Sequence, residues 1–472
     1  MSVFEDEDIP TNDAIDGTTP SPEPGDSEHE RLIFQSIHRR NLNHIKEDET
    51  QSKRYSVPEG GSNTRKPFCD VARERINEHI HPPRSMDEWI GTFLPCYTWL
   101  RTYDWRAILV TDILAGLAVG VMAVPQSMSY AKLAELPVEY GLYSALFPIW
   151  AYSVFGSSRQ LAVGPVALVS LMLGTGLNNE MAKMGISKDD PTYYDVRTTF
   201  AIQTSLLVGL LNIAMGLVRL GFVTIFMSHA VISGFISGAS LIIGMSQLKS
   251  ILGVTADGDN VQKIVASIIE NIGSFNYKTF LMGTSTVAAL LCFKQASKKF
   301  PRQKWLRAIG PLCVTTVAIL VTWRFNLSQN GIPIVKSIPS GFPAFTVSRW
   351  SPIQDFGGVI TTALSITIIG FMESIAIAKS LAAKHKYELD SSTELIGLGV
   401  ANFVGAMFQA YPVTGSFSRS AVNDQSGAQS GVSGMVTAAL VGVVLLLLTD
   451  VFEFMVSLLW SIRGRIDAEL SH

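Results

Sequence analysis

The sequence is poor in charged residues for its length. Of its 472 residues, 37 are Lys or Arg and 40 are Asp or Glu, so 16% are charged, whereas a soluble domain carries about 25%. This deficit excludes a single soluble globular domain. The formal net charge is −3, and no basic stripe is present that could neutralise phosphates, so we expect no nucleic-acid partner.

The sequence also has few cysteines and no catalytic motif. Its four cysteines, Cys69, Cys96, Cys292 and Cys313, lie far apart without CxxC spacing, so we predict neither a zinc site nor a disulfide framework. The segment Gly415–Arg419 is not a G-x-S-x-G elbow, and no His is placed to serve it. We therefore expect no enzyme activity, no metal and no cofactor.

The charges that are present concentrate near the N-terminus. Residues 1–100 hold 11 basic and 19 acidic residues, whereas the other 372 residues hold only 47 charges. Residues 1–90 have little apolar periodicity, which predicts a disordered, acidic cytosolic tail. The opening MSVFEDEDIP lacks the regions of a cleaved signal peptide. Glu28–Ile33 has the shape of an adaptor-read sorting signal, although chance is the more frequent explanation.

Apolar stretches of membrane-spanning length fill the rest of the chain. A spanning helix needs roughly 20 apolar residues, and Gly116 and Gly120 have the GxxxG spacing of close helix packing. We predict an all-α multi-pass membrane protein. Its eleven expected segments are 107–130, 141–156, 164–178, 198–218, 221–250, 278–293, 308–323, 356–382, 394–409, 416–428 and 431–449.

Basic residues in the loops predict the orientation. The stretch Lys294–Arg307 contains six basic residues and no acid, which places it in the cytosol by the positive-inside rule. The loops 179–197, 252–277 and 325–355 then face away from the cytosol, and the sequon at Asn326 lies in one of them. The basic residues expected on the cytosolic side are Arg101, Arg106, Arg159, Arg219, Lys384 and Lys386.

Two short motifs recur in the same order. Ser129–Ala134 resembles Ala376–Ala382 at an offset of 247 residues, and Ser158–Val163 resembles Ser418–Val422 at an offset of 260. Seven segments lie between residues 107 and 323, an odd number, so a second copy would enter the membrane from the opposite side. This predicts an inverted repeat with a site between broken helices at the midplane.

Two segments have the pattern of half-helices. Gly164-Pro165 precedes a short apolar run, and Pro fits the first position of a helix rather than its interior. The extended Tyr411–Gly415 precedes Ser416, which is available as an N-cap. Two helix N-termini would therefore meet inside the membrane. Each carries roughly +0.5 charge and unpaired N–H groups, which attract an anion.

Glu373 and Arg419 are charged residues at predicted membrane depth. Such a charge is costly unless paired and indicates a functional site, with a purely structural Glu373–Arg419 pair as the alternative. Gln126 and Tyr130 flank Pro125, where simple polarity at a helix kink explains them equally well. Two helix ends and Arg419 would balance a dianion, and a proton on Glu373 would keep the loaded site neutral. This motivates the hypothesis of proton–anion coupling.

Five longer motifs resemble the sulfate permease (SulP) family, and most closely its plant-type vacuolar sulfate transporters. They are Val124–Ala134, Tyr140–Tyr143, Gly156–Pro165, Met372–Lys379 and Tyr411–Asn423, and the likeness covers about residues 95–450. The resemblance implies two inverted seven-helix repeats, with a core domain that moves like an elevator against a gate domain. It also implies sulfate transport with protons. The implied anion-site residues are Gln126, Tyr130, Ala167, Ser416, Phe417, Ser418 and Arg419, with Glu373 as proton carrier.

The resemblance also defines the expected domains and partners. We expect a first transmembrane repeat at 91–324, an incomplete second repeat at 356–460 that reaches the start of segment 12, a polar tail at 461–472, and no STAS domain. Expected partners are sulfate, protons, the lipid bilayer and a second copy in a homodimer. The expected location is the vacuolar membrane, with the plasma membrane as alternative and a cytosolic N-terminus. An anion exchanger or channel for chloride, bicarbonate, oxalate or molybdate remains open, as does a truncated fragment that does not transport.

Overall fold

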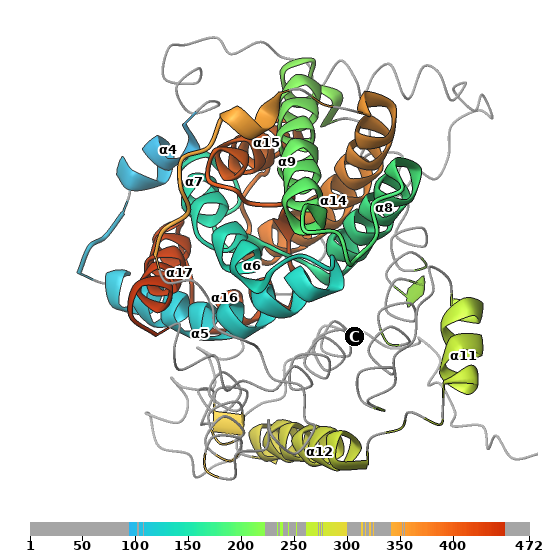
Figure 1. Cartoon of the computed structure of the whole chain (residues 1–472). Helices are drawn as coiled ribbons and strands as arrows, with labels where there is room; N and C mark the ends of the chain where they lie inside the picture. Colours follow the sequence, from blue (N-terminus) through green and yellow to red (C-terminus); the bar gives the residue numbers. More distant parts are fainter. Residues whose placement is uncertain are drawn as a thin grey trace, which may run out of the picture. The chain divides into compact units, whose positions relative to one another are not determined.

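Helices make up almost all of the described structure (Figure 1). The computed structural model describes residues 94–221, 261–299 and 341–448, apart from single positions within them, and a few isolated residues between these ranges. The described elements belong to one compact unit, Arg75–His472. In this part of the chain the strands are one short pair, β1 (Val163–Gly164) and β2 (Thr414–Gly415). The all-α class is confirmed.

Most of the described helices follow the predicted segments in order, but α11 (Val261–Glu270) and η3 (Ser348–Trp350) lie in the predicted loops 252–277 and 325–355. Three of them, α5, α9 and α14, are long and apolar enough to cross a membrane, and α12 continues past its predicted end at residue 293. The helices are α4 (Pro95–Arg101), α5 (Leu109–Leu133), α6 (Val138–Ser144), α7 (Phe147–Phe155), α8 (Ala167–Met184), α9 (Tyr193–Leu217), α11 (Val261–Glu270), α12 (Tyr277–Lys299), η3 (Ser348–Trp350), α14 (Phe356–His385), α15 (Ser391–Met407), α16 (Phe417–Gln425) and α17 (Val432–Val443), which continues into the π-helical turn η4 (Val444–Leu448).

The second predicted segment, 141–156, is two short helices rather than one. α6 ends at Ser144 and α7 begins at Phe147, with Pro148 in its first turn. Because Pro has no backbone N–H, it is tolerated at a helix start and not in the interior. The break gives Ser144 a role between the two repeats, since its hydroxyl accepts a hydrogen bond from the Tyr411 N–H at 2.8 Å.

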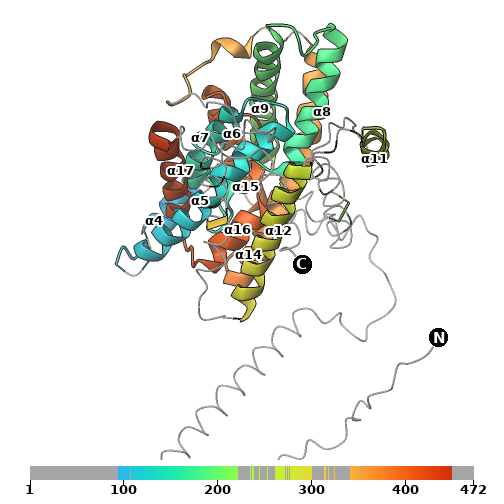
Figure 2. The same ribbon diagram turned by 60° about the horizontal axis from the view of Figure 1, so that its bottom comes forward.

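The strand pair and the two helices that begin just after its strands lie at the centre of the described fold. β1 and β2 pair antiparallel, with Val163 opposite Gly415 and Gly164 opposite Thr414. α8 starts after β1 and α16 starts after β2. α5 packs against both of these helices, and α14 packs against both and against β2. The two long helices therefore both contact the elements that carry the helix starts (Figure 2).

The strand pair relates the two halves of the chain by an approximate twofold axis. Val163 and Thr414 are 251 positions apart, as are Gly164 and Gly415, so exchanging the halves maps one residue pair onto the other. The Ala-Lys match at offset 247 agrees with this relation, because it lies in α5 and α14. The Ser-Arg match at offset 260 does not, and that prediction is wrong. Ser158 precedes β1 whereas Ser418 follows β2, so the two serines cannot occupy equivalent places.

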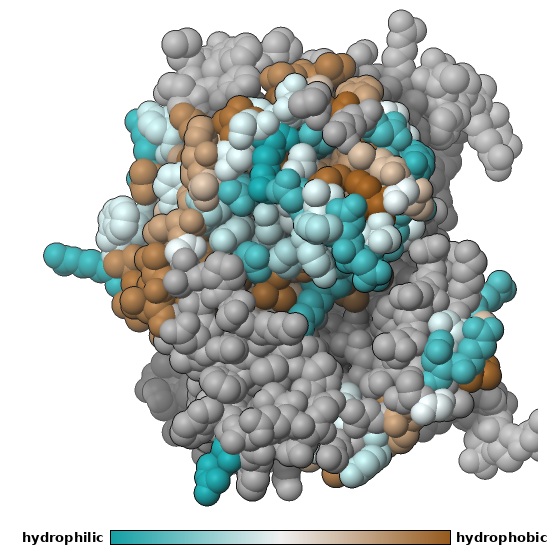
Figure 3. Space-filling view, viewed as in Figure 1, coloured by the Kyte–Doolittle hydropathy of each residue, from teal (hydrophilic) through white to brown (hydrophobic). Residues whose placement is uncertain are grey.

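α17 packs closely on α5 over two glycines. A Cβ on Gly116 would lie 2.4 Å from the Ser433 carbonyl oxygen, and a Cβ on Gly120 would lie 2.7 Å from Leu440 Cδ2. The predicted close packing at this GxxxG pair is confirmed. Hydrophobic residues gather on the surface near these helices (Figure 3). The large exposed ones on α5, α17 and η4 are Val110, Ile113, Leu114, Leu117, Val443, Leu446 and Leu447.

Charged residues group at the two ends of α14. Near its first residue, Lys183 lies 3.0 Å from Asp355. Near its last residue, Lys384 lies 2.5 Å from Asp424, and the Arg159 guanidinium lies over the Tyr387 ring at 5.3 Å. The 30 residues of α14 span about 45 Å at 1.5 Å per residue. Arg159 and Lys384 therefore share one end, as predicted, and the 179–197 loop lies at the other.

Several predictions fall outside the described residues. These are the tail 1–90 with Glu28–Ile33, most of segments 221–250 and 308–323, the sequon at Asn326, and the tail 461–472.

Candidate functional site

The start of α16 is built as the sequence predicts. Ser416 is the N-cap, and its hydroxyl accepts a hydrogen bond from the Arg419 N–H at 3.5 Å. The extended approach to this helix is held by Asn402, whose Oδ1 accepts from the Val413 N–H at 2.8 Å and whose Nδ2 donates to the Val413 oxygen at 3.0 Å. The side chain of Asn402 therefore pairs with the backbone as a neighbouring strand would, just before β2 begins at Thr414.

The start of α8 differs from its prediction by two residues. Pro165 was expected as the first helical residue, but α8 begins at Ala167, and Val166 is an extended N-cap without a side-chain hydrogen bond. β1 pairs with β2 immediately before Pro165, and the backbone is still extended at Val166. With no side-chain cap, the first N–H groups of α8 are left for a ligand. Gly164 has φ +146°, and a Cβ there would lie 3.1 Å from Arg419 Nη2.

Arg419 is buried, with 1% of its surface exposed, and it bonds to α5. Its Nη1 donates to Gln126 Oε1 at 3.1 Å, and Gln126 Nε2 donates to Ser418 Oγ at 3.3 Å. Ser418 Oγ in turn lies 3.4 Å from Ser416 Oγ. Gln126 therefore joins α5 to the start of α16. These bonds favour a role in the site over simple polarity at a helix kink.

The other predicted site residues lie around these groups with different roles. Tyr130 is buried on α5, one turn beyond Gln126, and Ala167 is the buried first residue of α8. Phe417 packs against a buried apolar cluster that includes Leu161 and Ile377. The side chain of Phe417 is therefore held by apolar packing. Phe417 belongs to the site because it is the first residue of α16.

Glu373 lies on α14, which packs against α16 and β2. Its side chain is half-buried, and its buried Oε2 has no hydrogen-bond partner among the residues that the structure describes. Arg419 acts on this carboxyl electrostatically. Burial without a hydrogen-bond partner destabilises the charged carboxylate, so it favours the neutral, protonated form. An ionisable residue in such a place also indicates a functional site.

Glu394 is a buried acid that supports the site and was not predicted from the sequence. This carboxylate is fully buried in α15 and accepts hydrogen bonds from Tyr152 OH and from the N–H groups of Ser157 and Ser158 at 3.2 and 3.3 Å. It thereby holds the connector that leads into β1. Its position in the sequence, next to an uncharged apolar run, is the signal that could have identified it. The same run could have identified Asn402, which is the single polar residue within Leu395–Met407.

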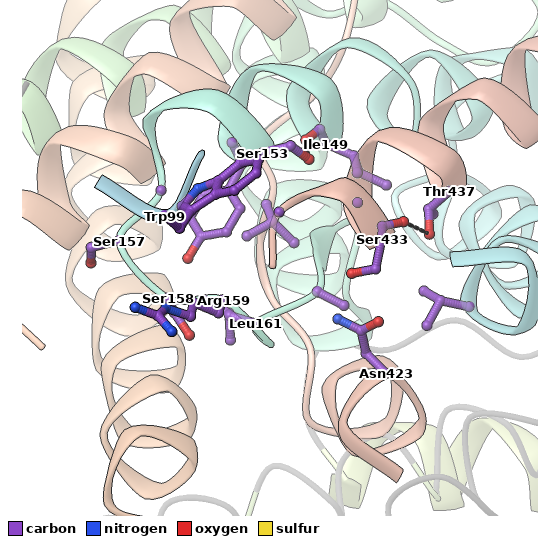
Figure 4. A pocket seen from close by; sticks show the side chains of 17 residues that line it. Trp99, Ile149, Ser153, Ser157, Ser158, Arg159, Leu161, Asn423, Ser433 and Thr437 are labelled. Carbon is purple, nitrogen blue, oxygen red and sulfur yellow. Dashed lines mark hydrogen bonds between the residues drawn. The ribbon is translucent and has the colours of Figure 1, made fainter. Parts of the chain in front are cut away.

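A small pocket lies beside the site and does not include it (Figure 4). Trp99 of α4, Ile149 of α7, Asn423 of α16 and Thr437 of α17 are among the residues that line it, and no predicted site residue does. The buried Asn423 Oδ1 accepts no hydrogen bond from the described residues. The pocket contains none of the residues predicted to bind the anion, so it is separate from the candidate anion site.

Together the central groups form a place suited to an anion. Two helix starts supply partial positive charge and N–H donors, and Arg419 supplies a full positive charge next to them. Among the described residues no group of three or more His, Cys, Asp or Glu could hold a metal. The arrangement can bind an oxyanion through helix ends, a guanidinium and hydroxyl groups.

Comparison with known proteins gives consistent similarities. Residues 109–458 match the family model described as the Sulfate permease family. Sulfate transporter 4.1, chloroplastic, from Arabidopsis thaliana is 44% identical over 368 residues, which are 78% of this chain and 52% of that protein. Probable sulfate transporter 4.2 from the same plant is 43% identical over 368 residues with the same coverage. The chain thus spans about half the length of the curated relatives it matches.

Solved structures match as well. The overall structure of SLC26A9 superposes with a TM-score of 0.76 at 25% identity, covering 88% of this chain and 64% of that one. This match supports the helical fold on which the site is built.

Proposed function

The chain belongs to the sulfate permease family, and on that premise we propose that it is a secondary active transporter that moves sulfate together with protons across a membrane. One observation carries the proposal. The start of α16, capped by Ser416, and the start of α8, which has no side-chain cap, follow paired strands, with the buried Arg419 beside them. These groups suit the binding of a small oxyanion.

Charge balance supports proton coupling through Glu373. Two helix ends contribute roughly +1 in sum, and Arg419 contributes +1, which together match the −2 charge of sulfate. An ionised Glu373 would leave the loaded site at −1 in a medium of low dielectric constant. Within the described part of the chain, its Oε2 has no hydrogen-bond partner that would stabilise that charge. Loading sulfate therefore favours loading a proton as well.

Uptake of labelled sulfate into vesicles that contain the full chain tests the proposal. We expect uptake to exceed equilibrium when a proton gradient is imposed, and Glu373→Gln to abolish its dependence on the gradient. If Glu373→Gln concentrated sulfate as well as the wild type and with the same pH dependence, Glu373 would not be the proton carrier. Uptake that required internal chloride and ignored the proton gradient would instead support the exchanger.

We further propose that the described helices around the site move as one rigid body against a gate, in an elevator mechanism. Cross-links between the two halves support this. Glu394 holds the connector before β1, Ser144 holds Tyr411 before β2, and Asp112 accepts from the Gln429 N–H at 2.7 Å. Each bond joins one repeat to the other, so neither half can shift alone without breaking buried hydrogen bonds.

Location, orientation and assembly complete the proposal. The end of α14 near Arg159 and Lys384 faces the cytosol by the positive-inside rule, with the N-terminus on the same side, and the protein functions as a homodimer. We propose the vacuolar membrane as its location, with the plasma membrane as the alternative. The name of sulfate transporter 4.1, chloroplastic, makes the plastid a competing outcome. Imaging of a fluorescent fusion beside markers for the three membranes distinguishes them.

A further inference from the structure

A chain of three buried hydrogen bonds joins α14 to β2, immediately before α16. The Gly415 N–H donates to Ser374 Oγ at 2.8 Å. Ser374 Oγ lies 2.5 Å from Thr414 Oγ1, and Thr414 Oγ1 donates to the Gly370 oxygen at 2.6 Å. Ser374 is 0% exposed and Thr414 is 2% exposed, so water does not compete for these bonds.

The direction of this chain is determined by its two ends. A carbonyl oxygen can only accept, so the Thr414 hydroxyl must give its single proton to Gly370. Ser374 must then donate its proton to Thr414. Its remaining lone pairs accept the Gly415 N–H. Each hydroxyl therefore both donates and accepts, and removing one leaves buried partners unsatisfied.

Two members of the chain are sequence neighbours of residues that the proposed function uses. Ser374 directly follows Glu373 on α14. Gly415 directly precedes Ser416, the N-cap of α16. A Cβ on Gly370 would lie 3.3 Å from Thr414 Oγ1, so α14 and β2 approach closely at this point. The chain thus links the backbone of the acid-bearing helix to the backbone that starts the anion site.

The first repeat uses its equivalent position differently. Ser127 lies 247 positions before Ser374, and its hydroxyl donates to the Val124 oxygen at 2.9 Å within α5. α5 is instead joined to α16 by Gln126. Only the second repeat therefore uses this serine as a cross-link. The residue before it is the acid Glu373, whereas the residue before Ser127 is the amide Gln126.

We infer that Ser374 and Thr414 are positioning residues that hold the anion-binding end of α16 at a set distance from Glu373. This inference rests on the proposed function and adds two residues to it. Neither residue is required to touch sulfate. Their hydroxyls keep the α16 donors aligned, and they keep the charge of Glu373 close enough for its protonation to strengthen anion binding.

The test uses a matched pair at one position. Thr414→Val keeps the shape of the side chain and removes the hydroxyl, whereas Thr414→Ser keeps the hydroxyl and removes a methyl group. With labelled sulfate and the full chain purified in detergent, we expect Thr414→Val to bind about five- to tenfold more weakly at pH 5.5. We expect the ratio of affinities at pH 5.5 and 7.5 to fall by half or more, and Thr414→Ser to stay near wild type.

Two further variants complete the design. Ser374→Ala interrupts the same chain at its other hydroxyl and replaces Thr414→Val if that variant fails to fold. Thr367→Val is the control, because Thr367 is 1% exposed on the same helix but donates only within it, to the Ala363 oxygen at 2.7 Å. A merely structural role would lower the melting temperature and leave the pH ratio of the folded fraction unchanged.

The outcomes separate this inference from the proposed function. If the wild type binds sulfate more tightly at pH 5.5 and Thr414→Val and Ser374→Ala keep both its affinity and its pH ratio within twofold, the positioning role is overturned and the proposed function stands. If the wild type binds no sulfate, or binds it equally at both pH values, the proposed function fails and this inference fails with it.

Discussion

Replacing Gln126 by Glu places a negative charge directly against Arg419. In the structure Gln126 Oε1 lies 3.1 Å from Arg419 Nη1, so the new carboxylate would form an ion pair at that distance. Two unit charges 3.1 Å apart attract each other by about 5 kcal/mol at an effective dielectric constant near 20. Desolvation of the new carboxylate offsets part of this attraction. We expect a net effect of about 2 kcal/mol against a bound anion, which corresponds to roughly thirtyfold weaker sulfate binding.

Equilibrium binding of labelled sulfate to the purified chain at pH 7.5 measures this effect. Gln126→Met is the matched control, because it has similar length, carries no charge and also loses both hydrogen bonds to α16. We expect the methionine variant to bind about fivefold more weakly than wild type, and the glutamate variant several-fold more weakly again. Equal affinities of the two variants would refute the reasoning, because Arg419 would then not attract the anion by its charge.

Two further predictions concern stability. Glu394→Ala leaves the hydroxyl of Tyr152 and the N–H groups of Ser157 and Ser158 without their acceptor. We expect the free energy of unfolding to fall by about 3 kcal/mol or more, which a lower melting temperature would show. The control Glu388→Ala, at an exposed position, should melt as wild type. Hydrogen bonds from Lys183 and from the Gly358 N–H lower the pKa of Asp355 from its ordinary value of 3.8 to about 2. Because that pKa is depressed in the folded state, the stabilisation is present above pH 3.8 and is lost as the pH falls toward 2. Asp355→Asn should therefore melt below wild type at pH 7, and the gap should close between about pH 4 and 2; a gap that stayed constant over this range would contradict the assignment.

The membrane-spanning character and the broken helices were predictable because they depend on local properties of the chain. Long uncharged runs locate α5, α9 and α14 within a few residues of their observed ends. Ser416 caps the start of α16 by chemistry that needs no distant contact. The start predicted for α8, at Pro165, is two residues too early. The β1–β2 pairing just before it joins segments about 250 residues apart, so the local sequence does not show it.

The partners of the polar residues were less predictable. Gln126 could be read from the sequence as kink polarity or as part of the site, and only its bonds to Ser418 and Arg419 decide between them. The sequence around Ser374 does not show that its hydroxyl bonds outside α14. Ser127, at the equivalent position of the first repeat, bonds within its own helix. The match of Ser158 to Ser418 misled the repeat alignment, since a two-residue motif is too short to show equivalence.

By itself the sequence determined that this is an all-helical membrane protein with two interrupted segments and with charged residues inside its apolar segments. It could do so because hydrophobic length, proline and helix capping act over a few neighbouring residues. The tertiary structure alone decided which residues from the two halves meet. Side-chain hydrogen bonds such as those of Arg419, Glu394 and Ser144 require atoms to approach within about 3 Å. Approaches that close, across more than 200 residues of chain, are set by how the repeats pack and not by any local pattern.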